Sequence, residues 1–240
     1  MLDEAGVRVE AQAQQFIVAG GQSFRLKSYT IPGDFSSASY PLAAAAVTGS
    51  EVTVKGVLPS RQGDSAIIDI LRAMGAKVSW DREKGDLWIR GGELQGVEVD
   101  ASRTPDLVPT IAVLGAVAKG KTTIVNAEHV RHKETDRLHA MAVELARMGA
   151  DIRERPDGLE ISGGRLHGAQ VHGWDDHRIV MALTVARDAN RYGRGGRCVL
   201  SGILPGDGKA GGEGGSGVRC YWASHHFFER MSRYSISSNS

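Results

Sequence analysis

The sequence predicts an α/β protein built from a repeated unit of about 70 residues. Residues 71–78 resemble residues 145–152, and residues 2–9 form a third, looser copy. Asp34, Asp106 and Asp176 stand 72 and 70 residues apart, and each opens an alanine-rich helical stretch. The closing segment of each copy runs into a pair of glycines, at 20–21, 91–92 and 163–164. One supersecondary unit is therefore expected to recur along the chain.

Each unit is predicted to contain a helix, a strand, a second helix and two closing strands. The first strand is expected at 51–54 and 122–125, where β-branched residues follow a glycine. The second helix is expected at 65–74 and 134–148, where apolar residues recur with helical spacing, and Gly149 is expected to end the latter. Turn-forming residues at 83–86 and 155–158 separate the closing strands.

The unit boundaries predict an incomplete array. Two whole units cover 34–92 and 106–164, and the opening helix of another covers 176–186. The chain begins halfway through a unit, which suggests a fragment. Since such units bury their apolar faces against neighbours, a cut array leaves faces open and is expected to be poorly soluble.

Composition excludes several classes of protein. Among 240 residues, 41% are hydrophobic and 24% are charged, as in soluble globular proteins. The net charge of +1 gives no argument for nucleic-acid binding. No apolar run is long enough for a transmembrane helix, and the acidic start predicts no signal peptide. We therefore expect a cytoplasmic protein that binds neither membranes nor nucleic acids.

The composition changes at about residue 190. Eleven of the 31 glycines lie within 193–217, and both cysteines, Cys198 and Cys220, lie beyond 190. Residues 191–240 hold seven Lys and Arg against three Asp and Glu. The last 50 residues are therefore considered separately.

Cations cluster at two predicted helix N-termini, where the helix dipole disfavours them. Arg131, His132, Lys133 and Arg137 surround the start of the 134–148 helix, and His177 and Arg178 follow Asp176, a predicted N-cap. Either an anion binds there, or these are solvated residues paired with Glu134, Asp136 and Asp175.

Two aspartates at other helix starts also have two interpretations. Asp106, between Pro105 and Leu107, is either an N-cap or a general base. Asp34, followed by Ser36 and Ser37, is interpreted as an N-cap.

No metal or dinucleotide site is predicted. His129, His132 and His139 lack the spacing of a helical zinc site, and Cys198 and Cys220 with His225 and His226 match no zinc pattern. The glycine-rich 212–217 segment lacks the strand and helix that a dinucleotide loop requires.

Four segments carry the charged and capping residues considered above. They are Gly33-Asp34-Phe35-Ser36-Ser37-Ala38-Ser39-Tyr40, Pro105-Asp106-Leu107-Val108-Pro109-Thr110, Arg131-His132-Lys133-Glu134-Thr135-Asp136-Arg137, and Asp176-His177-Arg178-Ile179-Val180-Met181-Ala182. In order and in separation, these segments together resemble the EPSP synthase family (3-phosphoshikimate 1-carboxyvinyltransferases). The resemblance covers about residues 1–188.

The resemblance implies a fold of two domains, each with three βαβαββ units forming an inverse α/β barrel, and an active site in the cleft between them. Residues 1–30 then match the end of the N-terminal domain, and 31–188 match an incomplete C-terminal domain. Residues 189–240 form a tail that does not belong to the fold. The rest of the N-terminal domain, which completes the site, is absent.

The resemblance also implies a reaction without metal or organic cofactor. The carboxyvinyl group of phosphoenolpyruvate passes to the 5-hydroxyl of shikimate 3-phosphate through a tetrahedral intermediate that loses phosphate. Asp106 matches the general base and Glu134 a proton-transfer carboxylate. The shikimate 3-phosphate contacts are Asp106, His129 and Lys133, and the phosphoenolpyruvate contacts are Arg137, His177 and Arg178.

The sequence departs from the family at its end. A further catalytic lysine is expected after the 176–186 helix, but 193–200 offers none. We interpret the tail as a frameshifted translation, because glycine and arginine runs result when GC-rich valine and glutamate codons are read out of register. A genuine flexible basic extension is the alternative, and sequencing the encoding DNA distinguishes the two.

Two other functions remain open. One is a non-catalytic fragment, since half of the cleft is missing and the chain alone is expected to be inactive. The other is UDP-N-acetylglucosamine enolpyruvyl transferase, which shares the fold but fits residues 133–137 less well.

Overall fold

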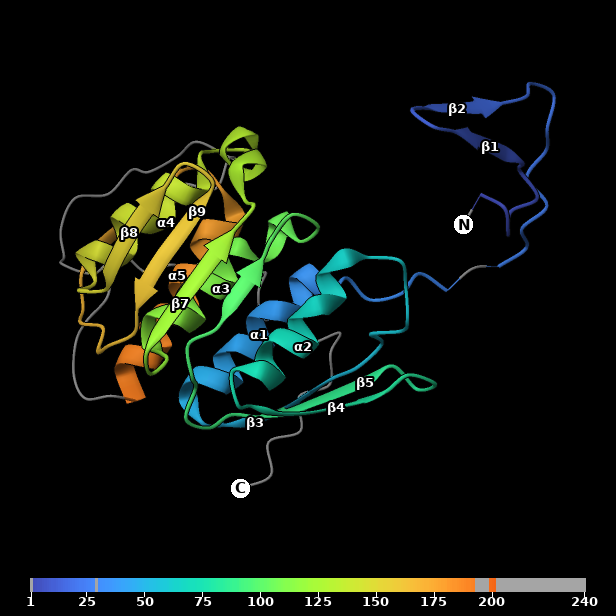
Figure 1. Ribbon diagram of the computed structural model, residues 1–240. Coiled ribbons are helices and arrows are strands. Elements are labelled where there is room, and N and C mark those ends of the chain that lie inside the picture. The colour runs from blue at the N-terminus through green and yellow to red at the C-terminus, as the bar shows by residue number, and fades with distance from the viewer. Residues whose placement is uncertain (1, 29, 193–198, 202–240) are drawn as a thin grey trace, which may run out of the picture. The chain divides into compact units, whose positions relative to one another are not determined.

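The computed structural model describes residues 2–28, 30–192 and 199–201 (Figure 1). The chain divides into two compact units, Met1–Pro32 and Gly33–Ser240. The tail proposed from the sequence, 189–240, lies almost wholly outside the described residues, as do Cys198, Cys220, His225, His226 and the 212–217 segment.

The first unit contains one antiparallel hairpin. Strands β1 (Val9–Gln12) and β2 (Gln15–Val18) pair so that Gln12 faces Gln15, and Ala13 in the turn has a φ of 43°. Several large apolar side chains of this unit are exposed, among them Phe16 at 78% and Phe24 at 73%.

The second compact unit, Gly33–Ser240, contains the same arrangement of three strands twice. Strands β3 (Glu51–Val54), β4 (Lys77–Asp81) and β5 (Asp86–Arg90) form an antiparallel sheet in the order β3-β5-β4. Strands β7 (Lys121–Val125), β8 (Asp151–Arg155) and β9 (Gly158–Ser162) repeat this order as β7-β9-β8. The repeat predicted from the sequence is therefore confirmed.

A short strand ahead of the first helix completes the repeated βαβαββ motif. Strand β6 (Glu98–Asp100) pairs in parallel with β7, and β10 (Gln170–His172) pairs in parallel with β11 (Val199–Ser201). The order β6, α3, β7, α4, β8, β9 is a complete βαβαββ unit. The predicted α/β fold is thus present.

The first helix of each unit lies inside and the second lies further out. The inner helices α1 (Phe35–Thr48), α3 (Val108–Val117) and α5 (His177–Tyr192) contact one another. Helices α2 (Ile67–Ala73) and α4 (Arg137–Arg147) pack against the strands of their own units. In Figure 1, α1 and α2 cover one face of the β3-β5-β4 sheet.

The second helices begin later than predicted. A 3₁₀ turn, η1 (Gly63–Ala66), precedes α2, so the predicted 65–74 helix begins at Ile67. The predicted 134–148 helix begins at Arg137, because Asp136 caps it by accepting the His139 N–H at 3.0 Å. Two further 3₁₀ turns, η2 (Pro105–Leu107) and η3 (Glu128–His132), precede α3 and α4.

The paired glycines allow close packing at the end of each unit. A Cβ on Gly163 would lie 1.5 Å from the Ala118 carbonyl oxygen, and one on Gly91 would lie 2.2 Å from that of Ala45. These two carbonyl oxygens lie at the C-terminal ends of α3 and α1, the inner helices of the two repeats. The absence of a side chain at these two positions lets the last strand approach that helix.

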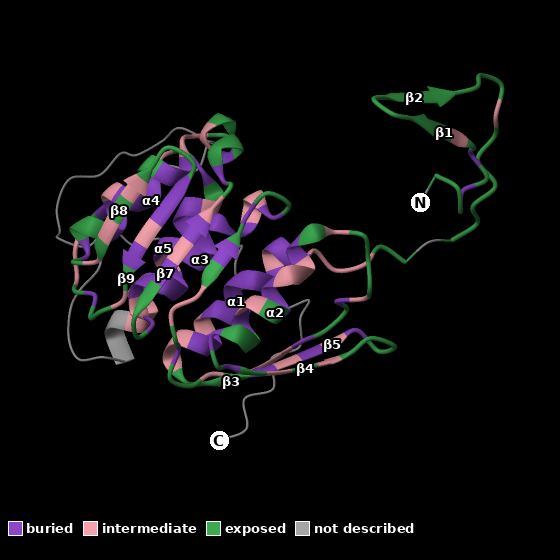
Figure 2. Cartoon of the chain, viewed as in Figure 1, coloured by how far each residue is buried: buried purple, intermediate pink, exposed green. Residues whose placement is uncertain are grey.

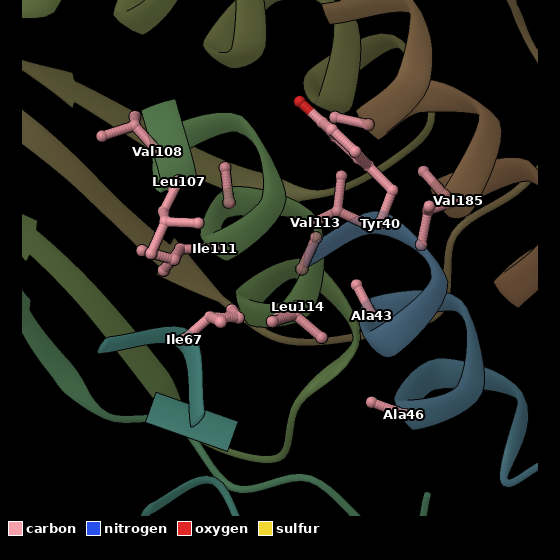
Figure 3. Close-up of a cluster of buried hydrophobic side chains, with 14 of the residues drawn as sticks. Tyr40, Ala43, Ala46, Ile67, Leu107, Val108, Ile111, Val113, Leu114 and Val185 are labelled. Carbon is pink, nitrogen blue, oxygen red and sulfur yellow. The ribbon is translucent and has the colours of Figure 1, made fainter. Parts of the chain in front are cut away.

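The core follows the inner helices. Helix α3 is buried from Val108 to Ala116, and Figure 2 shows it buried along its length. In Figure 3, Tyr40 and Ala43 of α1 lie beside Val113 of α3 and Val185 of α5. This packing fixes the N-terminal ends of three helices, which carry the polar residues considered next. None of the described helices is long and apolar enough to cross a membrane.

Candidate functional site

The N-terminal ends of the inner helices carry a cluster of charged residues. Asp34 precedes α1, Asp106 lies in η2 ahead of α3, and Asp176 precedes α5. Helix N-termini present free N–H groups and the positive end of the dipole, so this end of the fold favours anions. In this chain the anions present are its own carboxylates.

Arg137, the first residue of α4, is the centre of the cluster. Its side chain is 1% exposed and bonds three carboxylates: Nε donates to Asp176 at 2.7 Å, Nη1 to Asp106 at 2.9 Å and Nη2 to Glu134 at 2.5 Å. Burial alone would lower the pKa of Arg137, but Asp176, Glu134 and Asp106 outweigh it and raise the pKa. Arg137 is therefore held charged and in one orientation.

Asp106 receives a second guanidinium and an ammonium. Arg178 Nη2 donates to Oδ2 of Asp106 at 3.0 Å, and Lys133 Nζ lies 4.0 Å from Oδ1. The Arg178 side chain is largely buried, whereas that of Lys133 is more open. Three cations, two from helix starts and one from the loop after η3, thus converge on one carboxylate.

Asp106 does not cap a helix. It lies inside η2, the residue at the cap position is Thr104, and no side-chain cap hydrogen bond is found there. The N-cap interpretation of Asp106 is therefore wrong, because its carboxylate is directed to Arg137 and Arg178 instead. Asp176 is an N-cap as predicted, since Oδ1 accepts the Arg178 N–H at 2.8 Å.

Asp34 is also an N-cap, and Gln62 links it to a second carboxylate, that of Asp64. It accepts the N–H groups of Ser36 and Ser37 and the amide of Gln62. Burial would raise the pKa of Asp34, but the hydrogen bonds from Ser37, Gln62 and Ser36 hold it well below its ordinary value. The same Gln62 amide donates to Asp64 Oδ2 at 3.1 Å.

Asp64 and Tyr40 are polar residues of this region that the sequence did not indicate. Burial, followed by the charge of Asp106, raises the pKa of Asp64. Burial raises the pKa of Tyr40 to about 12, although the positive charge of Arg178 opposes this. The position of Asp64 in its repeat could have indicated it, because it lies three residues before α2, as Glu134 lies three residues before α4.

The histidines lie at the edge of the cluster. His177 Nδ1 is 3.9 Å from Asp176 Oδ1, and its side chain is half exposed. His129 is exposed in η3, which contacts η2, and in the described residues no bond joins it to Asp106 or Arg137. The described residues contain no group of three or more His, Cys, Asp or Glu placed to hold a metal ion.

The two interpretations of the basic residues each explain part of the cluster. Arg131 pairs with Asp136 at 2.8 Å and with Glu154 at 2.6 Å, as the ion-pair interpretation expects. Arg137 and Arg178 also pair with carboxylates, but both are shielded from solvent. Buried, oriented guanidinium groups beside exposed Lys133 can bind a carboxylate or phosphate that replaces part of the Asp106 contacts.

Comparison with known proteins gives one consistent result. Residues 1–189 match the family model described as EPSP synthase (3-phosphoshikimate 1-carboxyvinyltransferase). A 3-phosphoshikimate 1-carboxyvinyltransferase of Methanothrix thermoacetophila is 69% identical over 186 residues, covering 78% of this chain and 44% of the relative. The enzyme of that name from Methanocella arvoryzae is 61% identical over 186 residues, with the same coverage.

Solved structures agree. An EPSP synthase of Acinetobacter baumannii superposes with a TM-score of 0.72 at 25% identity, covering 99% of this chain and 54% of that structure. The chain therefore spans about half the length of the relatives it matches.

Proposed function

This chain belongs to the EPSP synthase family, and from that premise we propose that it carries the C-terminal-domain half of an enolpyruvyl transferase site. The proposed substrates are phosphoenolpyruvate and shikimate 3-phosphate. The observation that supports this most strongly is the convergence of Arg137, Arg178 and Lys133 on Asp106. Both substrates are anions, and these cations stand where anions are favoured.

The proposed chemistry assigns each group one task. Asp106 takes the proton of the 5-hydroxyl, the oxygen attacks C2 of phosphoenolpyruvate, and Glu134, as the proton-transfer carboxylate, gives a proton to the adjacent carbon, C3. The tetrahedral intermediate then loses phosphate and a proton from C3, which Glu134 takes back. Arg137, Arg178 and His177 bind phosphoenolpyruvate, and Lys133 and His129 bind shikimate 3-phosphate.

The present ion pairs set a condition on binding. Arg137 and Arg178 both donate to Asp106, so an incoming carboxylate or phosphate competes with Asp106 for them. Once it has taken over these donors, Asp106 is released to accept a proton from the substrate hydroxyl. Binding and activation of the base are thus coupled in this proposal.

The domain assignment belongs to the same proposal. Residues 1–30 are taken as the end of the N-terminal domain and 31–188 as the C-terminal domain, and the family match ends at 189. The 189–240 tail is proposed to be a frameshifted, non-native sequence. Of this tail the structure describes the end of α5 and the strand β11, which pairs with β10. Turnover is expected to need the remaining N-terminal domain, which we expect to supply the rest of the cleft. The relatives extend well beyond the 44% of their length that this chain covers.

Calorimetric titration with phosphoenolpyruvate, with and without shikimate 3-phosphate, tests the proposal. Arg178→Met is expected to weaken phosphoenolpyruvate binding about tenfold or more, since a charge-assisted hydrogen bond contributes about 1.5–3 kcal/mol. Arg153→Met, on an exposed position of β8, is the matched control and should bind as the unmodified chain does.

Two results would overturn the proposal. One is equal binding by the Arg178 and Arg153 variants. The other is a chain, folded by circular dichroism, that fails to bind either anion and gains no turnover when the N-terminal domain is co-expressed. UDP-N-acetylglucosamine in place of shikimate 3-phosphate tests the alternative transferase, and enhancement of binding by that sugar nucleotide alone would favour it.

A further inference from the structure

The loop between β10 and α5 has an unusual backbone. Trp174 and Asp175 have φ angles of 54° and 52°, so two consecutive non-glycine residues are left-handed. Residues with side chains rarely adopt this conformation, and it persists only where surrounding contacts hold it. The loop leads directly into Asp176, His177 and Arg178, three residues of the charged cluster.

A buried carboxylate on α4 holds this loop. Glu144 is 0% exposed, Oε2 accepts the backbone N–H of His172 at 3.0 Å, and Oε1 accepts the indole N–H of Trp174 at 2.8 Å. Arg147 Nη1 lies 2.9 and 3.0 Å from the two oxygens. A buried carboxylate is costly unless its oxygens are bonded, and the last residue of β10 and the loop after it supply one donor each.

Glu144 and Arg137 act on the loop from the same side. They are seven residues apart in α4, which is two helical turns and places them on one face. Arg137 holds Asp176, immediately after the left-handed pair, while Glu144 holds His172 and Trp174. The strained residues are therefore fixed at both ends by one helix.

The Trp174 ring has further contacts that fix its orientation. His139 of α4 packs edge-on against the ring, with centroids 5.6 Å apart, and His172 does so at 6.1 Å. The backbone N–H of Trp174 donates to His172 Nδ1 at 2.9 Å. Because these contacts already fix the Trp174 ring, the bond from its indole N–H to Glu144 holds the loop in one position relative to α4.

We propose that Glu144 is a positioning residue for the anion site. It holds the left-handed Trp174–Asp175 backbone, and this sets the direction in which α5 presents Arg178 to Asp106. The inference rests on the proposed function only for the identity of the anion. The positioning of the loop is a separate property and is measured separately.

Glu144→Gln tests the proposal in the full 240-residue chain. The amide keeps the size but replaces one acceptor oxygen with a donor group that faces the N–H groups of the loop. Amide hydrogen exchange at residues 174–178 is expected to accelerate about tenfold or more, and phosphoenolpyruvate affinity to fall by a similar factor. Trp174→Phe, which removes the indole N–H and reduces the ring to one benzene ring but leaves the Glu144 carboxylate and its bond to His172, should give a smaller change in the same direction.

Two controls separate positioning from general stability. Arg147→Ala removes the half-exposed partner of Glu144 but leaves both bonds from Glu144 to His172 and Trp174. It should therefore lower the melting temperature without selective acceleration of exchange at 174–178. Ile161→Ala truncates a buried residue of β9 and should lower the melting temperature without selective acceleration in the loop.

The outcomes are decisive in either direction. Unchanged exchange at 174–178 in Glu144→Gln overturns the proposal, as does equal loop acceleration in Ile161→Ala at a matched melting temperature. A chain that binds no phosphoenolpyruvate refutes the proposed function, yet the exchange comparison still decides the role of Glu144.

Discussion

Arg137 cannot be replaced without disturbing the fold, because its buried side chain pairs with three carboxylates. A buried guanidinium is costly unless it is paired, and Asp106, Glu134 and Asp176 all bond it. Removing it would leave the fully buried Asp176 without its partner, a loss that typically costs about 3–5 kcal/mol. Arg178 is the better probe of anion binding, because a folding defect is less of a risk there.

Asp34 gives a prediction about stability at the same scale. Asp34→Ala removes the acceptor for two N–H groups of α1 and for Gln62, so we expect the free energy of unfolding to fall by about 1 kcal/mol at pH 7. Urea denaturation measures this. Asp34→Asn, which can still cap the helix, should lose less, and equal losses in the two variants would contradict the capping explanation.

The lowered pKa of Asp34 adds a pH dependence. A carboxyl whose pKa is lower in the folded chain stabilises it at pH values above its ordinary range, and this contribution is lost as the pH falls toward the folded-state pKa. Below about pH 4, the stability of the unmodified chain should therefore fall more steeply than that of Asp34→Asn. If the stability of the two chains falls equally steeply below that pH, Asp34 is not the source of the pH dependence.

The elements were largely predictable, because each repeat carries local signals. The order of helices and strands, the turns at 83–86 and 155–158, and the caps at Asp34 and Asp176 all follow from residue type and spacing. The helix starts at 65 and 134 were wrong by two and three residues. There the chain forms 3₁₀ turns or caps, and apolar spacing does not detect either.

The site was less predictable than the elements. Cations at helix starts indicated the region in which the charged cluster lies, but the bonds from Asp106 to Arg137 and to Arg178 join residues 31 and 72 positions apart. No local pattern states which carboxylate such a cation meets. The role of Glu144 was missed for the same reason, since its partners lie 28 and 30 residues away in a loop.

The repeated glycines give a prediction about packing between elements. Gly163→Ala would place a Cβ 1.5 Å from the Ala118 carbonyl oxygen, so β9 must move away from α3. Overpacking of this kind costs about 3 kcal/mol, to be measured as a lower urea midpoint. Gly164→Ala is the matched control, because nothing lies within 4 Å of its Cβ. Similar midpoints for both variants would show that the close approach is unimportant.

At the scale of the whole molecule, the two units differ in how they bury apolar residues. The second unit has a continuous core formed by its inner helices and sheets. In the first unit, Phe16, Ile17 and Val18 are exposed in succession along β2, and Phe24 and Ile31 are exposed beyond it. Contiguous exposed apolar residues of this kind promote association.

We therefore expect the chain to self-associate through its first unit. Sedimentation velocity should show concentration-dependent oligomers, and Phe16→Ser with Phe24→Ser should reduce them because two of the most exposed apolar side chains are removed. Gln12→Ser with Gln14→Ser changes two exposed polar positions of the same hairpin and is the matched control. If both double variants associate like the unmodified chain, the exposed apolar side chains of the first unit do not drive association.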